Sequence, residues 1–544
     1  MRQTILSVVL EVEPQSARHL AGLIEDFRRF QEDKDLPGQE SYSKLRDGVP
    51  SLHFLSMSIF RGADYDPLFV IEANFDGPPV DFWAQIETTL ANQLRPMLRC
   101  CKRPLGGDGP TFDAVTKPGS RQPLTPYLVK RVQKPSVFHQ GNRGLARDRI
   151  LQERDLFLAT RVALNQSSPT APNPFRGIPA ELIHHDLRAA LIGRFPWLGT
   201  QAPERITRAE RALDMAKLAG FAFAALLALS LPGIVLALLL PARHFFILVA
   251  ALFVATVIFP LWTHAAREGE GVPRQTGGLS LDMLSLKNIV VAIAALVIYA
   301  AVASAIGALI PWLHGATCAD ALHAAARVVL LGLASALLVM LPAVVAWLRW
   351  LERADSSQDA PPVDQRQVGE MLRREDRIPQ NHMGSVVLVK PGILRMALFR
   401  AGHRGLGLLL RVKATDGYLG SMRTVHFAHW AFVNNSSRLM FFSNFDHSWE
   451  SYLDDFIEKA HAGLTLAWGS GVGFPPTRFL VLDGASHGRK FKAWARHSMA
   501  VNRIWYSAYK DLTVDQIERN VRIADGLRKP ALTPEEAAAW ARDL

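Results

Sequence analysis

Apolar positions follow two different patterns along the chain. Short strand-like runs, each bounded by polar or turn residues, occur near both ends, whereas four long uninterrupted runs lie in the middle. In the N-terminal part, strand-like runs at 7–14, 52–61 and 67–75 alternate with amphipathic stretches at 15–30 and 79–95. A period near two predicts strands and a period near 3.6 predicts helices. The N-terminal part is therefore expected to run strand, helix, strand, strand, helix.

The C-terminal part repeats this order with matching sequence fragments. Three short strings recur in the same order and at similar spacing: "SVVL" at 7–10 and 385–388, "HF" at 53–54 and 426–427, and "NFD" at 74–76 and 444–446. These ordered matches predict an internal duplication. Strand, helix, strand, strand, helix is the ferredoxin-like plan, so each copy is expected to form one such unit. Asp is a good helix cap, so Asp76 and Asp446 are each expected to cap the helix that follows.

The four long apolar runs predict helices that cross a membrane. An apolar helix of about 20 residues spans the hydrocarbon core of a bilayer. The runs lie at 218–240, 245–262, 288–312 and 326–350. Lys and Arg gather before the first run, between the second and third, and after the fourth. Because such residues mark the cytoplasmic side, both soluble parts are expected there, in an integral protein of a bacterial inner membrane.

These elements predict an α+β fold with two ferredoxin-like units and a four-helix transmembrane insert. The expected parts are a first ferredoxin-like unit (1–110), a linker and helical extension (111–215), the transmembrane region (216–352), a linker (353–382) and the second unit with C-terminal helices (383–544). The apolar runs contain almost no ionisable residues, which favours anchoring over ion transport.

Charge and motifs narrow the expected partners. The net charge of +11 suits basic segments beside a bilayer of anionic lipids. The basic residues are dispersed rather than gathered into a stripe, so no nucleic-acid partner is expected. The three cysteines indicate neither a disulfide framework nor a zinc site. The chain also lacks a Walker A loop, a dinucleotide-binding fingerprint, a Gly-x-Ser-x-Gly elbow and a His-Glu-x-x-His motif.

The element order and the duplication resemble the dimeric α+β barrel superfamily. In that superfamily two ferredoxin-like units pair their sheets into a barrel, so the resemblance implies an intrachain α+β barrel, to which this chain adds the four-helix transmembrane insert. Its members include dye-decolourising peroxidases and chlorite dismutases, so the resemblance implies haem in the cavity of one unit and a peroxide substrate. The peroxidase motif Gly-x-x-Asp-Gly has only partial counterparts here, "NFDG" at 74–77 and "NFDH" at 444–447, and neither has the leading glycine. The resemblance covers the two units and does not extend to the membrane insert.

The candidate site lies in the second unit, which is richer in His, Trp and Arg than the first. The predicted catalytic residues are His426, Asn444, Asp446 and Arg496, the predicted cofactor-binding residues are Trp430 and His497, and His497 is the predicted metal ligand. Alternation along a strand places His426 on one face with Ala428, Trp430 and Phe432. Arg496 and His497 lie on a predicted amphipathic helix, where Arg496 is a charge partner for an anionic group and His497 a ligand or base.

Structural roles compete with each of these assignments. His53 occupies the position equivalent to His426, which favours a structural role for His426 as a core histidine bonded to the backbone. Arg496 and His497 suit a solvent-facing surface equally well. Two functions therefore stay open. One is a membrane-anchored oxidoreductase resembling haem peroxidases; the other is a non-catalytic cytoplasmic barrel, tethered to the membrane, that binds a small hydrophobic ligand or a protein. The oligomeric state is also left open.

Overall fold

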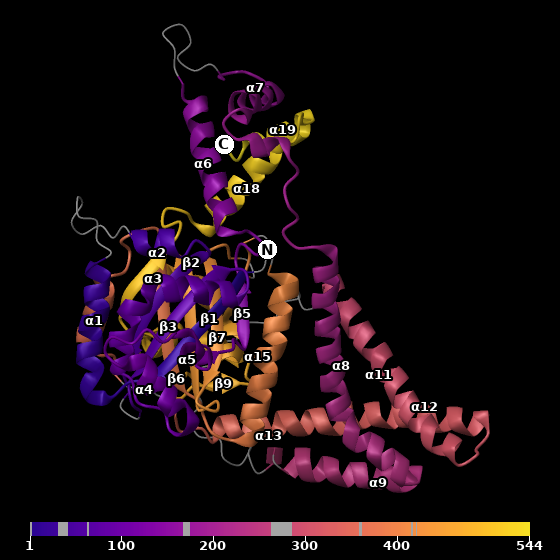
Figure 1. Cartoon of the computed structure of the whole chain (residues 1–544). Coiled ribbons are helices and arrows are strands. Elements are labelled where there is room, and N and C mark those ends of the chain that lie inside the picture. The colour runs from indigo at the N-terminus through magenta and orange to yellow at the C-terminus, as the bar shows by residue number, and fades with distance from the viewer. Residues whose placement is uncertain are drawn as a thin grey trace.

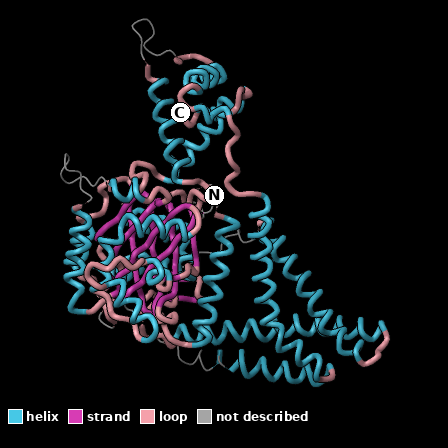
Figure 2. The backbone as a smooth tube through the Cα atoms, in the orientation of Figure 1, coloured by secondary structure: helices cyan, strands magenta, loops and turns pink. Residues whose placement is uncertain are grey.

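The computed structural model describes residues 3–30, 42–62, 65–166, 175–259, 261–262, 285–357, 362–414, 417–419 and 422–544. It is a mixed structure of antiparallel sheets and helices (Figures 1 and 2). The first sheet has the order β11-β2-β3-β1-β4 and the second has the order β5-β7-β8-β6. Their strands are β1 (Gln3–Glu11), β2 (Leu52–Phe60), β3 (Leu68–Asp76), β4 (Val132–Gln133), β5 (Val137–Gln140), β6 (Gln380–Leu388), β7 (Val425–Val433), β8 (Arg438–Asp446) and β11 (Asn502–Ser507). A small ribbon pairs β9 (Thr477–Arg478) with β10 (Leu482–Asp483).

Each half of the chain lends one strand to the sheet of the other half. β5 follows β4 after three residues, yet it pairs with β7 of the second sheet. In the same way, β11 follows the second half and pairs with β2 of the first sheet. The expected first unit of 1–110 therefore leaves out β4, which completes its sheet, and β5, which joins the other one. This exchange ties the two halves into one folded body.

The two sheets face each other across an apolar layer, and helices cover their outer faces. Both sheets contribute to this layer, which consists of Val9, Phe60, Leu68, Val70, Val386, Ala431, Val433, Met440, Phe442 and Ala500. Outside the first sheet lie α1 (Ala17–Arg29), α2 (Ser43–Gly48), α3 (Pro79–Arg99), α4 (Gly109–Thr116) and α5 (Thr125–Val129). Outside the second lie α14 (Gln365–Leu372), α15 (Ile393–Lys413), α16 (Trp449–Trp468) and α17 (Gly488–Ser498).

The register shows that the "SVVL" match is out of step by one residue. Asp76 and Asp446, the ends of the two "NFD" strings, pair with Gln3 and Gln380. Four residues after Gln3 lies Ser7, and four residues after Gln380 lies Gly384, so Ser7 corresponds to Gly384 rather than to Ser385. Ser7 lies opposite Glu72, four residues before Asp76, whereas Ser385 lies opposite Phe441, five residues before Asp446. A shift of one residue along a strand moves each side chain to the opposite face of the sheet, so the alignment of the two serines is wrong.

Four helices form a separate layer at one end of the sheets (Figure 1). They are α6 (Arg147–Leu164), α7 (Ala180–Ile192), α18 (Val514–Arg528) and α19 (Pro534–Ala541). α6 comes after β5 and α18 comes after β11, so each exchanged strand leads into one of the two helices that pack at the centre of this layer. Their shared apolar core includes Leu156, Leu187, Ile523, Leu527 and Trp540.

Three helices are long and apolar enough to cross a membrane: Arg208–Leu239, Leu286–Leu313 and Cys318–Arg353. They correspond to α8, to α11, and to α12 (Cys318–Ser335) continued through a π-helical turn (Ala336–Met340) into α13 (Leu341–Arg353). The remaining predicted run forms a shorter apolar helix, Ala242–Ile258, which begins as α9 (Ala242–Phe253). Apolar helices of membrane-spanning length are therefore confirmed for three of the four predicted runs.

Two acidic residues connect the last apolar helix to the β9–β10 ribbon and to the end of β6. The buried carboxylate of Glu352 accepts hydrogen bonds from the backbone amides of Phe479 and Leu480, at 2.9 and 2.8 Å. One turn later, Asp355 forms an ion pair with Lys390 at 2.7 Å, just beyond the end of β6. The end of β6 that carries Leu388 therefore lies beside the apolar helices.

Candidate functional site

His426 forms part of a chain of buried polar contacts that ends at a distant helix. Its Nε2 lies 2.8 Å from Oδ1 of Asp446. The other carboxylate oxygen of Asp446 accepts a hydrogen bond of 2.7 Å from the backbone amide of Val514, the first residue of α18. One oxygen of Asp446 therefore contacts the strand histidine, and the other accepts a hydrogen bond from an amide at the helix N-terminus that has no partner within the helix.

The first half contains a similar arrangement, in which one oxygen of Asp76 faces both groups and Nε2 of His53 makes no hydrogen bond. His53 Nε2 lies 3.1 Å from Oδ2 of Asp76, and this oxygen accepts a hydrogen bond of 2.7 Å from the backbone amide of Arg147, the first residue of α6. The expectation that each Asp caps the next helix in sequence is wrong, because the N-cap residues of α3 and α16 are Pro78 and Ser448. Each Asp instead reaches the helix that follows an exchanged strand.

A β-bulge separates His426 from the residues expected to share its face. The pairing of β7 with β8 shifts between Val425 and Phe427, which interrupts the alternation at His426. His426 contacts Phe54 of the first sheet, with ring centroids 5.4 Å apart. Trp430 packs outward against Trp468, with centroids 5.7 Å apart. The prediction that His426 and Trp430 share one face is therefore wrong.

His53 sits at an equivalent shift in the pairing of β2 with β3, between Leu52 and Phe54. Its ring lies 5.4 Å from that of Phe427 in the second sheet. Leu55 and Met57, which simple alternation would place beside it, belong to the outer core of the first sheet. Both "HF" pairs thus mark a bulge at the interface between the sheets.

The other predicted site residues lie in separate places. Arg496 is held by both carboxylate oxygens of Glu375, at 2.5 and 3.0 Å, and its guanidinium lies 3.7 Å from the ring centre of Trp449. His497, the next residue on α17, is exposed. The Asn444 side-chain oxygen accepts a hydrogen bond of 2.8 Å from the indole of Trp505. The structure therefore does not bring the six predicted residues together around one cavity.

The histidines chosen for haem do not suit that role here. Nε2 of His426 is engaged by Asp446, and the ring is enclosed by Phe54 and Tyr509. His497 is exposed, and neither histidine lines the two cavities described below. Over the described ranges, no group of three or more His, Cys, Asp or Glu side chains is placed to hold a metal ion.

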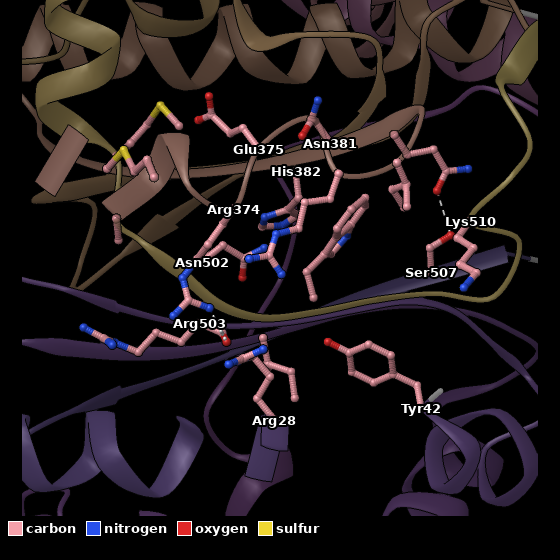
Figure 3. Close-up of a pocket in the computed structure, with 18 of the residues that line it drawn as sticks. Arg28, Tyr42, Arg374, Glu375, Asn381, His382, Asn502, Arg503, Ser507 and Lys510 are labelled. Carbon is pink, nitrogen blue, oxygen red and sulfur yellow. Dashed lines mark hydrogen bonds between the residues drawn. The ribbon is translucent and has the colours of Figure 1, made fainter. Parts of the chain in front are cut away.

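A cavity of about 430 Å³ opens where β6 and β11 meet the inner side of α1 (Figure 3). Figure 3 shows Asn381 and His382 on one wall and Arg28 and Tyr42 on the opposite wall, with Arg503 between them. The strand exchange builds this cavity, because β11 belongs to the second half of the chain but completes the first sheet. A pocket of this size is typical of small-molecule sites.

His382 is a buried imidazole at the cavity wall whose two ring nitrogens both lack a hydrogen-bond partner. Its Nε2 lies 3.8 Å from a carboxylate oxygen of Glu72, which is fully buried between the sheets. Glu72 accepts hydrogen bonds from Ser56, at 3.2 Å, and from the amide of Asn74. A carboxylate and an unsatisfied imidazole therefore lie together behind the cavity.

A second histidine extends this polar cluster between the sheets. His429 Nε2 lies 2.9 Å from the hydroxyl of Ser7, which pairs with Glu72 across β1 and β3. Burial lowers the pKa of His429 to about 4, and the charge of His382 acts in the same direction, although the carboxylate of Glu72 opposes both. His429 is therefore neutral near pH 7, because its pKa lies well below this value.

Arg503 supplies positive charge at the cavity and at a second hollow beside it. This neighbouring pocket, of about 360 Å³, is lined by Glu25, Glu370 and five arginines: Arg28, Arg373, Arg374, Arg377 and Arg503. Burial lowers the pKa of Arg503, and the charge of Glu370 partly opposes this shift. No side-chain hydrogen bond to a described residue contributes to the shift. Arginine still carries its charge in proteins, so the two pockets together present a positive surface.

Sequence reasoning missed Glu72, His382 and Arg503. A signal for Glu72 was present, because an acidic residue interrupts the apolar strand "LFVIEANFD". His382 precedes the fragment used for the duplication, in "QNHMGSVVL". Arg503 lies in "NRIWYS", which was expected to continue a helix but forms β11. The cavity depends on contacts between residues more than a hundred positions apart.

The chain was compared with models of protein families, with curated proteins and with solved structures, and none of them matches it.

Proposed function

We propose that the protein is a membrane-anchored barrel that binds a small molecule in the cavity between β6 and β11. The observation that carries this proposal is the lining of the cavity: a buried histidine, His382, with two unsatisfied ring nitrogens, beside a half-buried arginine, Arg503. Buried polar groups are normally hydrogen-bonded, so a ligand with acceptor groups would satisfy side chains that the fold leaves open. The proposal corresponds to the non-catalytic alternative.

The barrel in this proposal consists of two ferredoxin-like units of the dimeric α+β barrel kind. The order β4-β1-β3-β2 is the strand order of such a unit, and β6, β8 and β7 follow the same partial order. The reciprocal exchange of β5 and β11 and the matched contacts of Asp76 and Asp446 support a duplication of the whole unit, including the first turn of α6 and α18.

The membrane anchor in this proposal crosses the bilayer four times. Both halves share both sheets, so they lie on the same side of the membrane, and an even number of crossings is required. Three crossings by α8, α11 and α12–α13 would separate the halves. The apolar helix Ala242–Ile258 supplies the fourth. At 1.5 Å per residue its 17 residues span about 26 Å, close to the thickness of a bilayer core. In this proposal the barrel faces the cytoplasm, since Lys and Arg flank the apolar runs on that side, and the membrane is a bacterial inner membrane.

The haem-peroxidase interpretation stays a prediction with less support. Its proposed ligands are separated, with His426 engaged by Asp446 and His497 exposed on α17. A Soret absorption band in the detergent-purified protein, lost in a His426→Ala or His497→Ala variant, is the result that would favour it. A colourless protein that binds small molecules would favour the non-catalytic barrel.

The proposal is tested by blocking the cavity. We expect a fragment library screened by ligand-observed NMR against the full-length protein in detergent to yield binders. Asn502→Trp, at a half-buried cavity position, should abolish their binding because the indole fills the space. Asn165→Trp, at an exposed position after α6, is the control. Fragments that bind equally to the wild type and to Asn502→Trp would contradict the proposed site.

A further inference from the structure

The charge and shape of the cavity point to the class of ligand, an inference that rests on the proposed function. We infer that the ligand is a water-soluble organic carboxylate with a flat apolar body. Its carboxylate is bound by Arg503 and by an N–H of His382, and its body lies against Trp505, Met371 and Met499. Each part of this assignment comes from a different group of side chains in the cavity.

Arg503 is a partly buried guanidinium available for an anion, whereas Arg377, which lines the same cavity, is exposed and donates through Nε to the carbonyl of Arg373. Arg374 forms an ion pair with Glu25 at 3.2 Å, Arg28 pairs with the same carboxylate, and Arg496 is held by Glu375. By contrast, the Arg503 guanidinium makes no ion pair or hydrogen bond with a described side chain, although most of it is shielded from water. A partly desolvated charge without a partner is unfavourable, and a carboxylate matches its planar pair of donors.

The backbone around Arg503 fixes the place of its side chain. β11 pairs with β2 on both sides of this residue, through Asn502 with Ser58 and Ile504 with Met57. The register shifts between Asn502 and Ile504, so Arg503 lies in a bulge. Its carbonyl accepts a hydrogen bond of 3.3 Å from Arg374. Bulges re-aim a side chain at the edge of a sheet, and here the bulge directs Arg503 into the cavity (Figure 3).

His382 provides the second polar contact. In either neutral tautomer an imidazole has one N–H donor, and in the charged form it has two. Neither nitrogen of His382 has a partner, while the Glu72 carboxylate lies 3.8 Å behind the ring. An N–H on Nε2 facing Glu72 leaves Nδ1 as an acceptor in the neutral ring, whereas the imidazolium carries an N–H on both nitrogens. His382 therefore donates to a carboxylate ligand as the imidazolium, with Glu72 on one side of the ring and the ligand on the other.

The remaining wall selects a flat apolar body. Trp505 lies on the cavity wall with its ring centroid 6.2 Å from that of His382, and its indole N–H is already committed to Asn444. Its ring stacks on Phe54, with centroids 6.3 Å apart, so the ligand meets the part of the ring that Phe54 leaves uncovered. Met371 and Met499 line the same cavity. Aromatic faces and methionine side chains bind planar apolar groups well.

The cavity lies far from the apolar helices, which favours a ligand dissolved in water over a lipid headgroup. His382 is near the start of β6, whereas Lys390, beyond its other end, contacts Asp355 next to α13. Eight residues of extended chain separate them, which corresponds to about 27 Å at roughly 3.4 Å per residue. A bilayer at α13 would therefore not reach the mouth of the cavity.

The test uses matched ligands and the full-length protein in detergent. Calorimetric titrations compare 2-naphthoate with its neutral isostere 2-naphthamide and with 2-naphthyl phosphate, and a flotation assay uses phosphatidylglycerol vesicles. We expect the wild type to bind the carboxylate at least tenfold more tightly than the amide. Arg503→Gln should remove this preference, and His382→Phe should weaken it. Arg121→Gln, at an exposed loop position outside both pockets, should leave it unchanged.

Each alternative result has a distinct meaning. Equal binding of carboxylate and amide, blocked by Asn502→Trp, would overturn the ligand class but keep the binding site. A preference for the carboxylate that survives in Arg503→Gln would overturn the role of Arg503. Tighter binding of 2-naphthyl phosphate would overturn the carboxylate as the charged group of the ligand. Competition by the phosphatidylglycerol vesicles alone would overturn the water-soluble source of the ligand. Absence of binding by any fragment would reject the proposed function itself. Thermal unfolding of each variant shows whether it is folded.

Discussion

Asp76 and Asp446 each lie between two buried polar groups, a ring nitrogen of a strand histidine and the first amide of α6 or α18. His426 and both amides are hydrogen-bonded to the aspartate, whereas Nε2 of His53 lies 3.1 Å from Asp76 without a hydrogen bond. Leaving a buried donor unsatisfied costs about 1 to 3 kcal/mol. This explains why aspartate recurs at both positions. The histidines and "NFD" strings that suggested chemistry in the sequence thus have a role in holding the helical layer to the sheets.

Replacing Asp446 with alanine should therefore destabilise the protein. We expect Asp446→Ala to lower the free energy of unfolding by about 2 to 4 kcal/mol, because both His426 and the Val514 amide lose their partner. Asp454→Ala is the control, since Asp454 is exposed and forms only a surface ion pair with Lys492; its effect should stay within about 0.5 kcal/mol. Denaturant titrations in detergent measure both. Equal stability of the two variants would contradict the role of Asp446.

Among the elements, β6 faces the first sheet with a glycine, Gly384. A Cβ at Gly384 would lie 2.5 Å from the ring of Phe442 and 3.1 Å from that of Phe60, in the layer between the sheets. Phe60 and Phe442 belong to different sheets and touch edge to face. Gly384 therefore provides the space in which the two sheets meet.

Adding one methyl group at this position should separate the sheets. We expect Gly384→Ala to destabilise the protein by about 1 to 3 kcal/mol, as overpacked cores do. Gly22→Ala is a matched control, because a Cβ at Gly22 in α1 meets nothing within 4 Å; alanine there should stabilise by up to about 1 kcal/mol. Unfolding in denaturant distinguishes them, and a neutral Gly384→Ala would show that the sheets do not pack as described.

The sequence predicts these elements unevenly, for physical reasons. Antiparallel strands and long apolar helices were predictable, because periodicity and length are local properties. The bulges at His53 and His426 were not, since a one-residue shift has no local signature and reverses the faces that alternation predicts. The exchange of β5 and β11 was also missed, because strands of four and six residues are defined by distant partners. Arg503 could not be identified without that exchange.

At the scale of the whole molecule, three buried histidines make stability depend on pH. Burial lowers the pKa of His139, His403 and His429 to about 4 each, partly offset in His139 and His403 by backbone hydrogen bonds. The unfolded chain takes up these protons near the ordinary histidine value of about 6.5. Between these values the unfolded state binds more protons, so stability falls as the pH is lowered from about 6.5 to 4.

Each histidine should contribute up to about 2 to 3 kcal/mol to this loss at pH 4.5. We expect His139→Gln to reduce the difference in unfolding free energy between pH 7 and pH 4.5, because one of the three protons is no longer taken up. His185→Gln, at an exposed position on α7, should leave the difference unchanged. A pH dependence that is identical in His139→Gln and the wild type would contradict the assignment for His139.

The four-crossing topology can be tested with the native cysteines. Cys318 is exposed at the first residue of α12, whereas Cys100 and Cys101 are buried and burial raises the pKa of both thiols. The thiolate is the reactive form, so a membrane-impermeant maleimide should label Cys318 alone. With the barrel in the cytoplasm, labelling should occur in intact spheroplasts and vanish in Cys318→Ser. Labelling restricted to inverted vesicles would contradict this orientation.

The most direct test of the account is the crystal structure of the full-length protein grown with 2-naphthoate. The proposed function predicts difference density in the cavity between β6 and β11, with the carboxylate at hydrogen-bond distance, about 3 Å, from Arg503 and His382. The same crystals should show β11 paired with β2, since that exchange forms the cavity wall. Density for the ligand elsewhere, beside His497 on α17 for example, or an empty cavity at saturating ligand, would contradict the account.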